Sequence, residues 1–398
     1  MSHALVLGLG GCVDFEVAWS PELLAELAAE HAIAIGDLDS AVQVTDERSL
    51  LVSILSFVRE GVGGERFLAS SQLAVEFASR FDYQITLGGT CVRAAQAIAR
   101  LGVPSLVHLV SIDDNVRRLL DPRVAYLCSA ARDTLDPHLI IQFPGDAAVA
   151  LIDGEVHATH PNRIIYVNDP PNRDLPLSPE LPDALTGARA FLPSGFNVMR
   201  DPELLRERLR FLQLAMTRLT DDAVVFYEDA GFHDNALRDI VSAEFRGRVD
   251  IHSVNEDELQ SYVGRRLDLL DAEAVAGALT EFRPLAIAST IVVHTRVWTL
   301  AFGERAAGLS RAIAGGIDLA STRYCHGDHF TRHDLDAVRR LPRQPHGIGF
   351  AAEISRLLGD EVLCVPARTL DVEHPTSIGL GDTFVGGFLA ALVAEFPQ

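Results

Sequence analysis

Short apolar runs alternate with amphipathic segments through residues 190–294, and this alternation constrains the fold more than any other feature. Apolar runs that predict buried strands cover residues 190–192, 223–228, 249–253 and 291–294. Helical periodicity lies between them, over residues 202–218, 234–245, 255–263 and 272–280. Strands that alternate with helices in this way form a parallel sheet with helices on both of its faces. The sequence therefore predicts an α/β fold.

The pattern before residue 170 is less regular and predicts a smaller, β-containing lid over one edge of the main sheet. Residues 138–143 and 147–151 flank Pro-Gly-Asp, which predicts a hairpin. Residues 310–345 are rich in Gly, Arg and His, have weak periodicity and predict an irregular excursion. We assign to the large domain residues 1–14, 86–135 and 183–398, and to the lid residues 15–85 and 136–182.

The charge and the basic residues exclude several classes of function. The formal net charge is −21, which argues against a nucleic-acid surface or an anionic membrane as a partner. All 34 basic residues are arginine, because the chain has no lysine. A Walker A loop and the protein-kinase strand each need a lysine, as does Schiff-base chemistry. These three classes are excluded, and a phosphorylated substrate would need a cationic pocket or a metal.

The cysteines and the N-terminal segment indicate the cellular compartment in which the protein is expected. Five scattered cysteines include no C-x-x-C pair, so neither a disulfide framework nor a zinc site is predicted. The first residues lack a basic region and soon reach Asp14, which is unlike a signal peptide. No uncharged apolar run reaches 18 residues, so no membrane span is predicted. We expect a cytoplasmic location.

A glycine-rich turn near the C-terminus carries the strongest chemical signal. Residues 379–383 read Gly-Leu-Gly-Asp-Thr and run into an apolar helix rich in small residues. Unpaired N–H groups at a helix start attract phosphate oxygens, and glycine lets the backbone approach them. Asp382 would repel a phosphate there, unless it takes a proton from an attacking hydroxyl. The pattern indicates phosphoryl transfer to an alcohol, and the plainer alternative is an aspartate that caps the helix.

Two further acidic stretches are candidates for Mg²⁺. Glu228 ends an apolar strand, where ligands bind in open α/β sheets. Asn255 and Glu258 are three residues apart, so they share one helix face and could hold metal-bound waters and a phosphate oxygen. Ser253 and Glu256 fit a capping box. The alternative for each stretch is an acid that complements a helix N-terminus.

The N-terminal strand and a glycine pair are candidates for acceptor binding. Asp14 follows the first strand, and a carboxylate there could accept hydrogen bonds from sugar hydroxyls. Gly88 and Gly89 open an alanine-rich helix and allow close approach of the backbone to the same ligand, although tight helix–strand packing would explain them equally. His294 ends a strand, where it would line a nucleotide pocket or be an ordinary strand-end histidine.

In this order along most of the chain, these stretches resemble the ADP-dependent sugar kinases, the archaeal-type glucokinase and phosphofructokinase branch of the ribokinase-like superfamily. Gly-x-Gly-Asp at 379–382 and Asn-x-x-Glu at 255–258 are the specific matches. Residues 194–197, with Asn197, resemble a strand-end segment near the substrate. Phe226 stands where the family's His-x-Glu motif has histidine, and residues 90–93 follow the glycine pair where small or amide residues are expected.

The resemblance implies a ribokinase-like three-layer αβα fold and Mg²⁺-dependent transfer of a phosphoryl group from ADP to a sugar or sugar phosphate, which releases AMP. Asp382 would be the general base. The implied groups are, for the anion hole and nucleotide, Gly379, Leu380, Gly381, Thr383 and His294; for the sugar, Asp14, Gly88, Gly89 and Asn197; and for Mg²⁺, Glu228, Asn255 and Glu258. An ATP-dependent ribokinase-type kinase and a non-catalytic sugar or nucleotide sensor remain alternatives. Arg93, Arg163, Arg173 and Arg200 are available to bind a phosphate on the acceptor.

Overall fold

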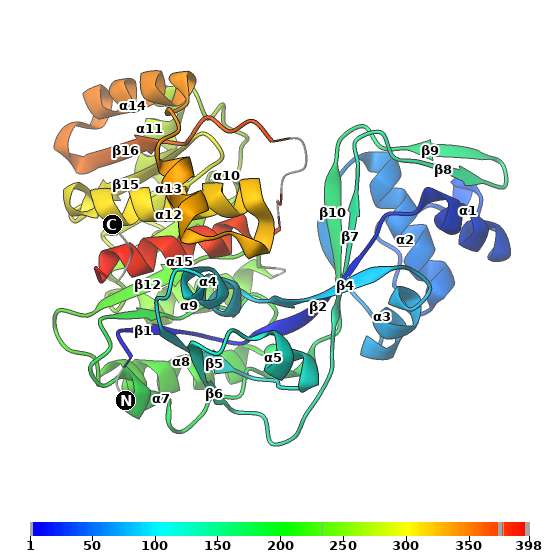
Figure 1. Cartoon of the computed structure of the whole chain (residues 1–398), viewed down its shortest axis with the longest axis horizontal. Helices are drawn as coiled ribbons and strands as arrows, with labels where there is room; N and C mark the ends of the chain where they lie inside the picture. Colours follow the sequence, from blue (N-terminus) through cyan, green and yellow to red (C-terminus); the bar gives the residue numbers. More distant parts are fainter. Residues whose placement is uncertain (1–2, 233, 373–375, 377, 395–398) are drawn as a thin grey trace.

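The computed structural model describes residues 3–232, 234–372, 376 and 378–394, and its larger half is built on a nine-stranded sheet (Figure 1). In order across the sheet, the strands are β16 (Val362–Pro366), β15 (Trp298–Gly303), β14 (Thr290–His294), β13 (Ile251–Asn255), β12 (Val224–Glu228), β11 (Ala190–Leu192), β1 (Leu5–Leu7), β5 (Ser105–Leu109) and β6 (Val124–Cys128). Only β15 runs against the others, because it pairs antiparallel with both neighbours. The predicted α/β fold with a mostly parallel sheet is confirmed.

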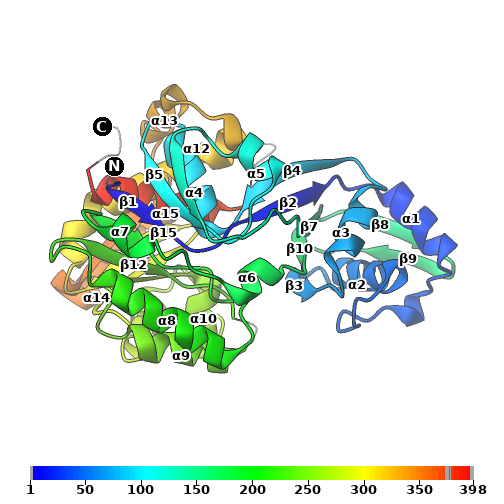
Figure 2. The same cartoon turned by 90° about the horizontal axis from the view of Figure 1, so that it is seen from below.

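Helices cover both faces of this sheet, and side chains of alternate strand residues pack against opposite layers. Leu5 and Leu7 of β1 belong to the cluster that packs under one helical layer, whereas Val6 belongs to the other. The first layer contains α4 (Thr90–Ala99), α12 (Ser310–His326) and α15 (Leu380–Leu392). The second contains α7 (Leu181–Leu185), α8 (Pro202–Met216), α9 (Asn235–Phe245), α11 (Ala272–Phe282) and α14 (Pro345–Leu358). Figure 2 shows α4, α12 and α15 above the sheet and α7, α8 and α9 below it.

A five-stranded sheet forms the core of the smaller half. Its strands, in order, are β3 (Gly64–Phe67), β10 (Asn162–Val167), β7 (His138–Phe143), β2 (Cys12–Val17) and β4 (Tyr83–Gly88). Its helices are α1 (Pro21–Glu30), α2 (Glu47–Glu60) and α3 (Ser71–Ala78), and beside them lies the hairpin of β8 (Ala148–Leu151) and β9 (Gly154–His157). Four shorter helices complete the described α-helices: α5 (Asp114–Leu119), α6 (Pro170–Asp174), α10 (Glu256–Val263) and α13 (Arg332–Arg339).

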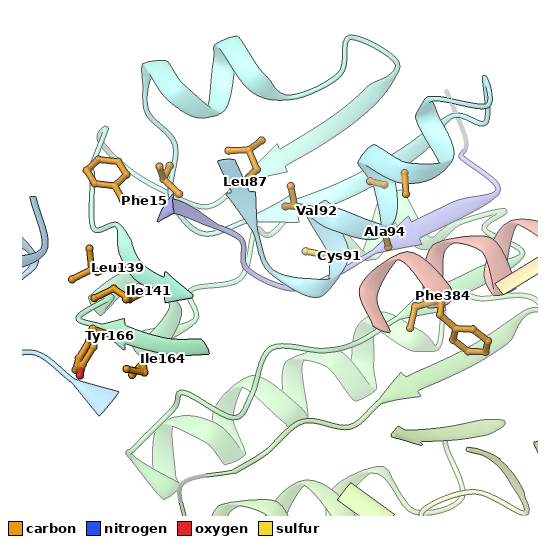
Figure 3. Packing of buried hydrophobic residues seen from close by; sticks show 14 of the residues in the cluster. Phe15, Leu87, Cys91, Val92, Ala94, Leu139, Ile141, Ile164, Tyr166 and Phe384 are labelled. Atoms are coloured by element: carbon orange, nitrogen blue, oxygen red, sulfur yellow. The ribbon is translucent and has the colours of Figure 1, made fainter. Parts of the chain in front are cut away.

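The two halves are joined through β2 and β4. The chain enters the smaller sheet along β2 and returns along β4, which pairs antiparallel with β2 and leads directly into α4 of the larger half. Buried side chains follow the same route, from Phe15 and Leu139 of the smaller sheet to Val92 of α4 and Phe384 of α15 (Figure 3). Groups on β2 are therefore held next to the helices of the larger half. The residue ranges assigned to the two domains stay a prediction.

Two expectations from the sequence were wrong. Residues 138–143 and 147–151 do not form a hairpin, because β7 pairs with β10 and β2 while β8 pairs with β9. Residues 310–345 are not irregular, since they contain α12 and α13. A Cβ atom on Gly315 would lie 2.8 Å from the carbonyl oxygen of Gly387 in α15, so glycines bring these two helices into close contact. In α12 these small residues stand between the buried apolar residues Ile313, Ile317 and Leu319, which weakens the apolar stripe that would have indicated this helix.

Among the described residues, no helix is both long and apolar enough to cross a membrane.

Candidate active site

A cavity of about 350 Å³ lies where the two halves meet, and both contribute to its walls. The smaller sheet supplies Asp14 and His138, and the larger half supplies Glu228 and Asp382. The predicted site residues that line the cavity are Asp14, Gly89, Asn197, Glu228, Gly379 and Asp382. Those that do not line it are Gly88, Leu380, Gly381, Thr383, His294, Asn255 and Glu258. Residues predicted for the base, the acceptor and the metal thus share one cavity.

The start of α15 has the geometry of an anion site. Gly379 precedes the helix with φ 68°, a left-handed conformation that favours glycine, and no side chain of the described residues caps the helix. A Cβ atom on Gly379 would lie 2.7 Å from the guanidinium of Arg93. The hydroxyl of Thr383 donates to the carbonyl oxygen of Gly379 at 2.8 Å, so it stabilises the turn from within. Without a side-chain cap, the first N–H groups of α15 remain available to an anion.

Arg93 of α4 connects the predicted acceptor residue with the predicted base. Its Nη2 donates to Oδ2 of Asp14 at 2.6 Å, and its Nε lies 3.9 Å from Oδ2 of Asp382. Glu16 lies 3.8 Å from the same Nη2. Burial opposes the charge of Arg93, but Asp14 and Asp382 raise the pKa of its guanidinium above the ordinary value. The sequence marked residues 90–93 as a departure from the family, and two of these four residues, Thr90 and Arg93, line the cavity.

The glycine pair allows the close contact between β4 and the start of the chain. A Cβ atom on Gly88 would lie 2.4 Å from Oδ2 of Asp14, and one on Gly89, which has φ 88°, would lie 2.9 Å from Cα of Gly11. Packing against the side chains of Asp14 and Cys12 therefore explains Gly88, and packing against the backbone of Gly11 explains Gly89. Gly88 lies directly beside Asp14, while Gly89 also reaches the cavity wall.

Several polar groups around Asp14 were missed in the sequence. Sγ of Cys12 donates to Oδ1 of Asp14 at 3.1 Å, and Nδ1 of His138 lies 3.7 Å from the same oxygen. Nε2 of His138 lies 3.1 Å from Oδ2 of Asp169, which also accepts a hydrogen bond from Asn172 at 2.6 Å. Cys12, His138 and Asn172 line the cavity. They match no spacing template, because the pairing of β2 with β7 brings His138 to Cys12 and Asp14, and Asn172 arrives on α6, where its amide donates to the carbonyl oxygen of Gly11.

Protonation in this cluster follows from burial and neighbouring charge. Burial and the charge of Asp14 raise the pKa of the Cys12 thiol to about 12. Burial alone would lower the pKa of His138, but interaction with Cys12 and the hydrogen bond to Asp169 raise it well above 6.5. Burial therefore favours the thiol form of Cys12, and the hydrogen bond to Asp169 favours the protonated form of the His138 ring.

Glu228 ends β12 with one carboxylate oxygen engaged and the other unpartnered. Oε1 lies 2.8 Å from Nε2 of His294, whose ring stacks on Phe384 with centroids 4.8 Å apart. Oε2 of Glu228 is buried and has no hydrogen-bond partner within the part of the chain that the structure describes. A buried carboxylate oxygen without a partner is costly, unless a cation or a ligand group completes the site. His294 stands behind Glu228 rather than on the cavity wall, so it supports this carboxylate directly.

Asn255 and Glu258 form the capping box of α10, which the sequence had assigned to Ser253 and Glu256. Oδ1 of Asn255 accepts the N–H groups of Asp257 and Glu258, and Oε2 of Glu258 accepts the N–H of Asn255. The earlier assignment was wrong because β13 continues through Asn255, so Asn255 and not Ser253 is the N-cap residue of α10. Oδ1 of Asn255 is thus occupied, while its Nδ2 can still donate to an anion.

The carboxyl of Glu258 is strongly affected by its acidic neighbours. Its side chain keeps some contact with solvent, yet burial, Glu228 and Asp229 raise its pKa from 4.5 to about 8. Asp229 itself is held by His252 at 3.2 Å and Tyr262 at 2.6 Å; burial opposes its ionisation, but these hydrogen bonds lower its pKa. Glu228 and Glu258 are therefore the acids that a bound cation would stabilise, and Asp229 is already satisfied.

Asn197 lies on the loop that follows β11. Gly195 has φ 87° and its backbone packs against Leu9, while the hydroxyl of Ser194 donates to the carbonyl oxygen of Gly8 at 2.6 Å. These contacts fix the loop against the first strand. They bring Asn197 to the same cavity as Asp14.

Comparison with known proteins gives a consistent result. A family model described as the ADP-specific phosphofructokinase/glucokinase conserved region matches residues 3–384. A hypothetical ADP-dependent phosphofructokinase from Pyrococcus horikoshii OT3 superposes with a TM-score of 0.78 at 18% identity, over 99% of this chain and 98% of that one. A phosphofructokinase from the same organism, solved with AMP, gives 0.77 at 17% identity, over 99% and 98%. An ADP-dependent kinase in complex with fructose-6-phosphate and ADPβS gives 0.75 at 11%, over 99% and 94%. No curated protein matches the chain.

Proposed function

Because the chain belongs to the family of ADP-specific phosphofructokinases and glucokinases, and is thus a sugar kinase, we propose that it transfers the terminal phosphoryl group of ADP to a hydroxyl of a sugar or sugar phosphate and releases AMP. The observation that carries the proposal is the shared cavity. Asp382, the uncapped start of α15, Glu228 and Asp14 all line it, although they are far apart in the sequence. A hydroxyl, a phosphoryl group and a carboxylate base could therefore meet at one place.

Asp382 is proposed as the general base that accepts the proton of the attacking hydroxyl. Its side chain lies in the first turn of α15 and is 24% exposed, so a substrate can reach it. The N–H groups of residues 380–382 would stabilise the negative charge on the transferred group, because they point out of the helix start without a side-chain partner. In phosphoryl transfer, positioning and charge stabilisation of this kind supply most of the catalysis.

Glu228 and Glu258 fit the role of holding Mg²⁺, with waters completing the coordination. Oε2 of Glu228 is buried without a partner, and the pKa of Glu258 is raised to about 8 by burial and by Glu228 and Asp229, so both acids gain from a cation nearby. Bound there, Mg²⁺ would neutralise charge on the diphosphate oxygens. Asn255 would contribute its Nδ2–H group to a phosphate oxygen, because its Oδ1 already accepts two backbone N–H groups.

The acceptor is proposed to bind at the other end of the cavity, against Asp14 and Asn197. The relatives solved with AMP and with fructose-6-phosphate and ADPβS support a nucleotide and a sugar phosphate as the ligands of this site. Arg93 and Arg163 line the cavity and would favour an anionic group on the acceptor, whereas Arg173 and Arg200 line neighbouring hollows.

The direct test is an assay of the purified protein with Mg²⁺ and ADP or ATP against glucose, fructose 6-phosphate, ribose 1-phosphate and nucleosides, with formation of AMP as the readout. AMP formation that depends on ADP and on one acceptor class is expected. Turnover with ATP alone would identify an ATP-dependent kinase instead. Tight binding of nucleotide and sugar with no AMP from any pair would identify a sensor.

A further inference from the structure

Three side chains with metal-ligating atoms meet on one face of the smaller sheet. Cys12 and Asp14 are two residues apart on β2, so they point to the same face, and β7 pairs His138 directly with Asp14. Sγ of Cys12, a carboxylate oxygen of Asp14 and a ring nitrogen of His138 all lie within 4.8 Å of one another, and Cys12 and Asp14 are buried. Among the described residues, no other group of three such side chains has this geometry.

We propose that Cys12, Asp14 and His138 form a binding site for a thiophilic divalent cation of the Zn²⁺ class. Sγ lies 3.1 Å and Nδ1 of His138 lies 3.7 Å from Oδ1 of Asp14. Tetrahedral zinc with bonds of about 2.0–2.3 Å spaces its ligand atoms roughly 3.3–3.6 Å apart, so these two distances lie within a few tenths of an ångström of that spacing. The third distance, between Sγ and the ring nitrogen, lies within 4.8 Å. All three residues line the cavity, which leaves the fourth position open toward it.

The surroundings of His138 match those of a metal-bound imidazole. Its Nε2 lies 3.1 Å from Oδ2 of Asp169, which leaves Nδ1 directed toward Asp14. Asp169 is itself held by the backbone N–H of Asn172 at 3.0 Å and by its side-chain amide at 2.6 Å. A carboxylate on the far nitrogen fixes the ring and makes the near nitrogen a better ligand.

The anionic ligands of the site balance the charge of a divalent cation. The thiol proton that Cys12 donates to Asp14 would leave to solvent as Sγ binds the cation, while Asp14 stays paired with Arg93 through Oδ2. A thiolate and a carboxylate together match the charge of the cation, which limits the cost of placing it in a buried site.

The ligand set separates this site from the proposed Mg²⁺ site. Thiolate and imidazole ligands suit Zn²⁺ and Co²⁺, whereas Mg²⁺ prefers oxygen ligands and keeps its waters. Excess Mg²⁺ should therefore leave the Cys12 site to Zn²⁺. Since Asp14 is proposed to hold the acceptor, a consequence that rests on the proposed function is that Zn²⁺ competes with the acceptor and not with ADP.

The test measures Zn²⁺ binding to the full chain by competition with a chromophoric chelator, in millimolar Mg²⁺ and without substrate. The wild type is expected to bind one equivalent. Cys12→Ser and His138→Asn should weaken binding by at least about 100-fold, and Asp169→Asn by about 10- to 100-fold. Cys128→Ser and His157→Asn, which change a cysteine and a histidine outside the cluster, should bind as the wild type does.

Co²⁺ gives a second readout that does not depend on the variants folding. Co²⁺ added to the wild-type protein should show a thiolate-to-cobalt charge-transfer band that Zn²⁺ abolishes. The proposal is overturned if this band is absent, or if a folded Cys12→Ser variant binds Zn²⁺ as tightly as the wild type. Stoichiometric binding with inhibition that is not competitive toward the acceptor would retain the metal site and contradict only the acceptor role of Asp14.

Discussion

The two ends of the cavity differ in how their charged groups are satisfied. The phosphoryl end, named for the proposed chemistry, is formed by Glu228 and the start of α15. Among the described residues, no side chain caps this helix and none pairs with Oε2 of Glu228, so these groups are available to a ligand. The acceptor end is formed by Asp14 and the residues around it. There, Asp14 is already paired with Arg93 at 2.6 Å and accepts a hydrogen bond from Cys12. The first arrangement suits diphosphate chemistry in general, whereas the second makes the acceptor displace or extend an existing network. We therefore expect the phosphoryl end to determine the type of reaction, and the acceptor end to determine which acceptor molecule binds.

The largest effect is expected from Asp382→Asn, which removes the proposed base and keeps the shape of the helix start. A positioned general base contributes about 10²- to 10⁴-fold, so kcat should fall by that factor while ADP still binds. Steady-state kinetics and a separate measurement of ADP binding check this. Asp360→Asn, on an exposed turn, is the matched control and should leave kcat unchanged. Near-normal turnover in Asp382→Asn would contradict the base assignment.

The next effect concerns Arg93, which links the two ends. Arg93→Met leaves Asp14 buried without its cation, and removal of one partner from a buried pair typically costs about 3–5 kcal/mol of the free energy of unfolding. Chemical denaturation of the protein measures the loss. The double variant Arg93→Met/Asp14→Asn should recover part of it, because it removes the unpaired charge.

Arg117→Gln is the matched control for Arg93→Met, since it breaks an exposed pair with Asp133 and should change stability far less. Equal losses for Arg93→Met and Arg117→Gln would show that the buried pair does not organise the cavity. The two ends would then have to be regarded as independent.

The two ends of the cavity also differ in how much of their structure could be predicted from the sequence. The glycine turn and helix start at residues 379–383 are local patterns, and an apolar run predicts the strand that ends at Glu228, so the sequence predicted both of these structural features. The acceptor end depends on the pairing of β2 with β7, which brings His138 to Asp14 across more than a hundred residues. No local pattern encodes that contact. For the same reason the sequence placed a hairpin at residues 138–151 where long-range pairing prevails.

A smaller, pH-dependent effect tests Glu258 at the phosphoryl end. Because burial and the acids at 228 and 229 raise its pKa from 4.5 to about 8, the folded state holds this proton more tightly than the unfolded state. This contribution to stability is complete below pH 4.5 and is lost as the pH rises to about 8. Glu258→Gln should flatten that part of the stability profile in Mg²⁺-free buffer, as denaturation at a series of pH values would show.

Mg²⁺ should bind the deprotonated carboxylate of Glu258, so its binding should have the opposite pH dependence to the stability contribution of this residue. Its apparent affinity should rise with pH, by up to about tenfold per unit, and level off near pH 8. Asp257→Asn, which removes an exposed acid from the same helix turn, should retain both the stability slope and this dependence. An unchanged slope in Glu258→Gln would contradict the role of Glu258 as the responding acid.

The smallest effect is expected from Thr383, which the sequence grouped with the nucleotide-binding residues. Its side chain is buried and its hydroxyl donates to the carbonyl oxygen of Gly379, so it holds the turn that presents the N–H groups of α15. Thr383→Val should cost about 0.5–1.5 kcal/mol of stability, as for one lost hydrogen bond, and change the KM for ADP little. Thr383→Ser, which keeps the hydroxyl, should restore the stability. A large rise in the KM for ADP without a loss of stability would mean that the hydroxyl of Thr383 leaves Gly379 to bind the nucleotide. The phosphoryl end would then rearrange when its ligand binds, as we expect of the network around Asp14 at the acceptor end.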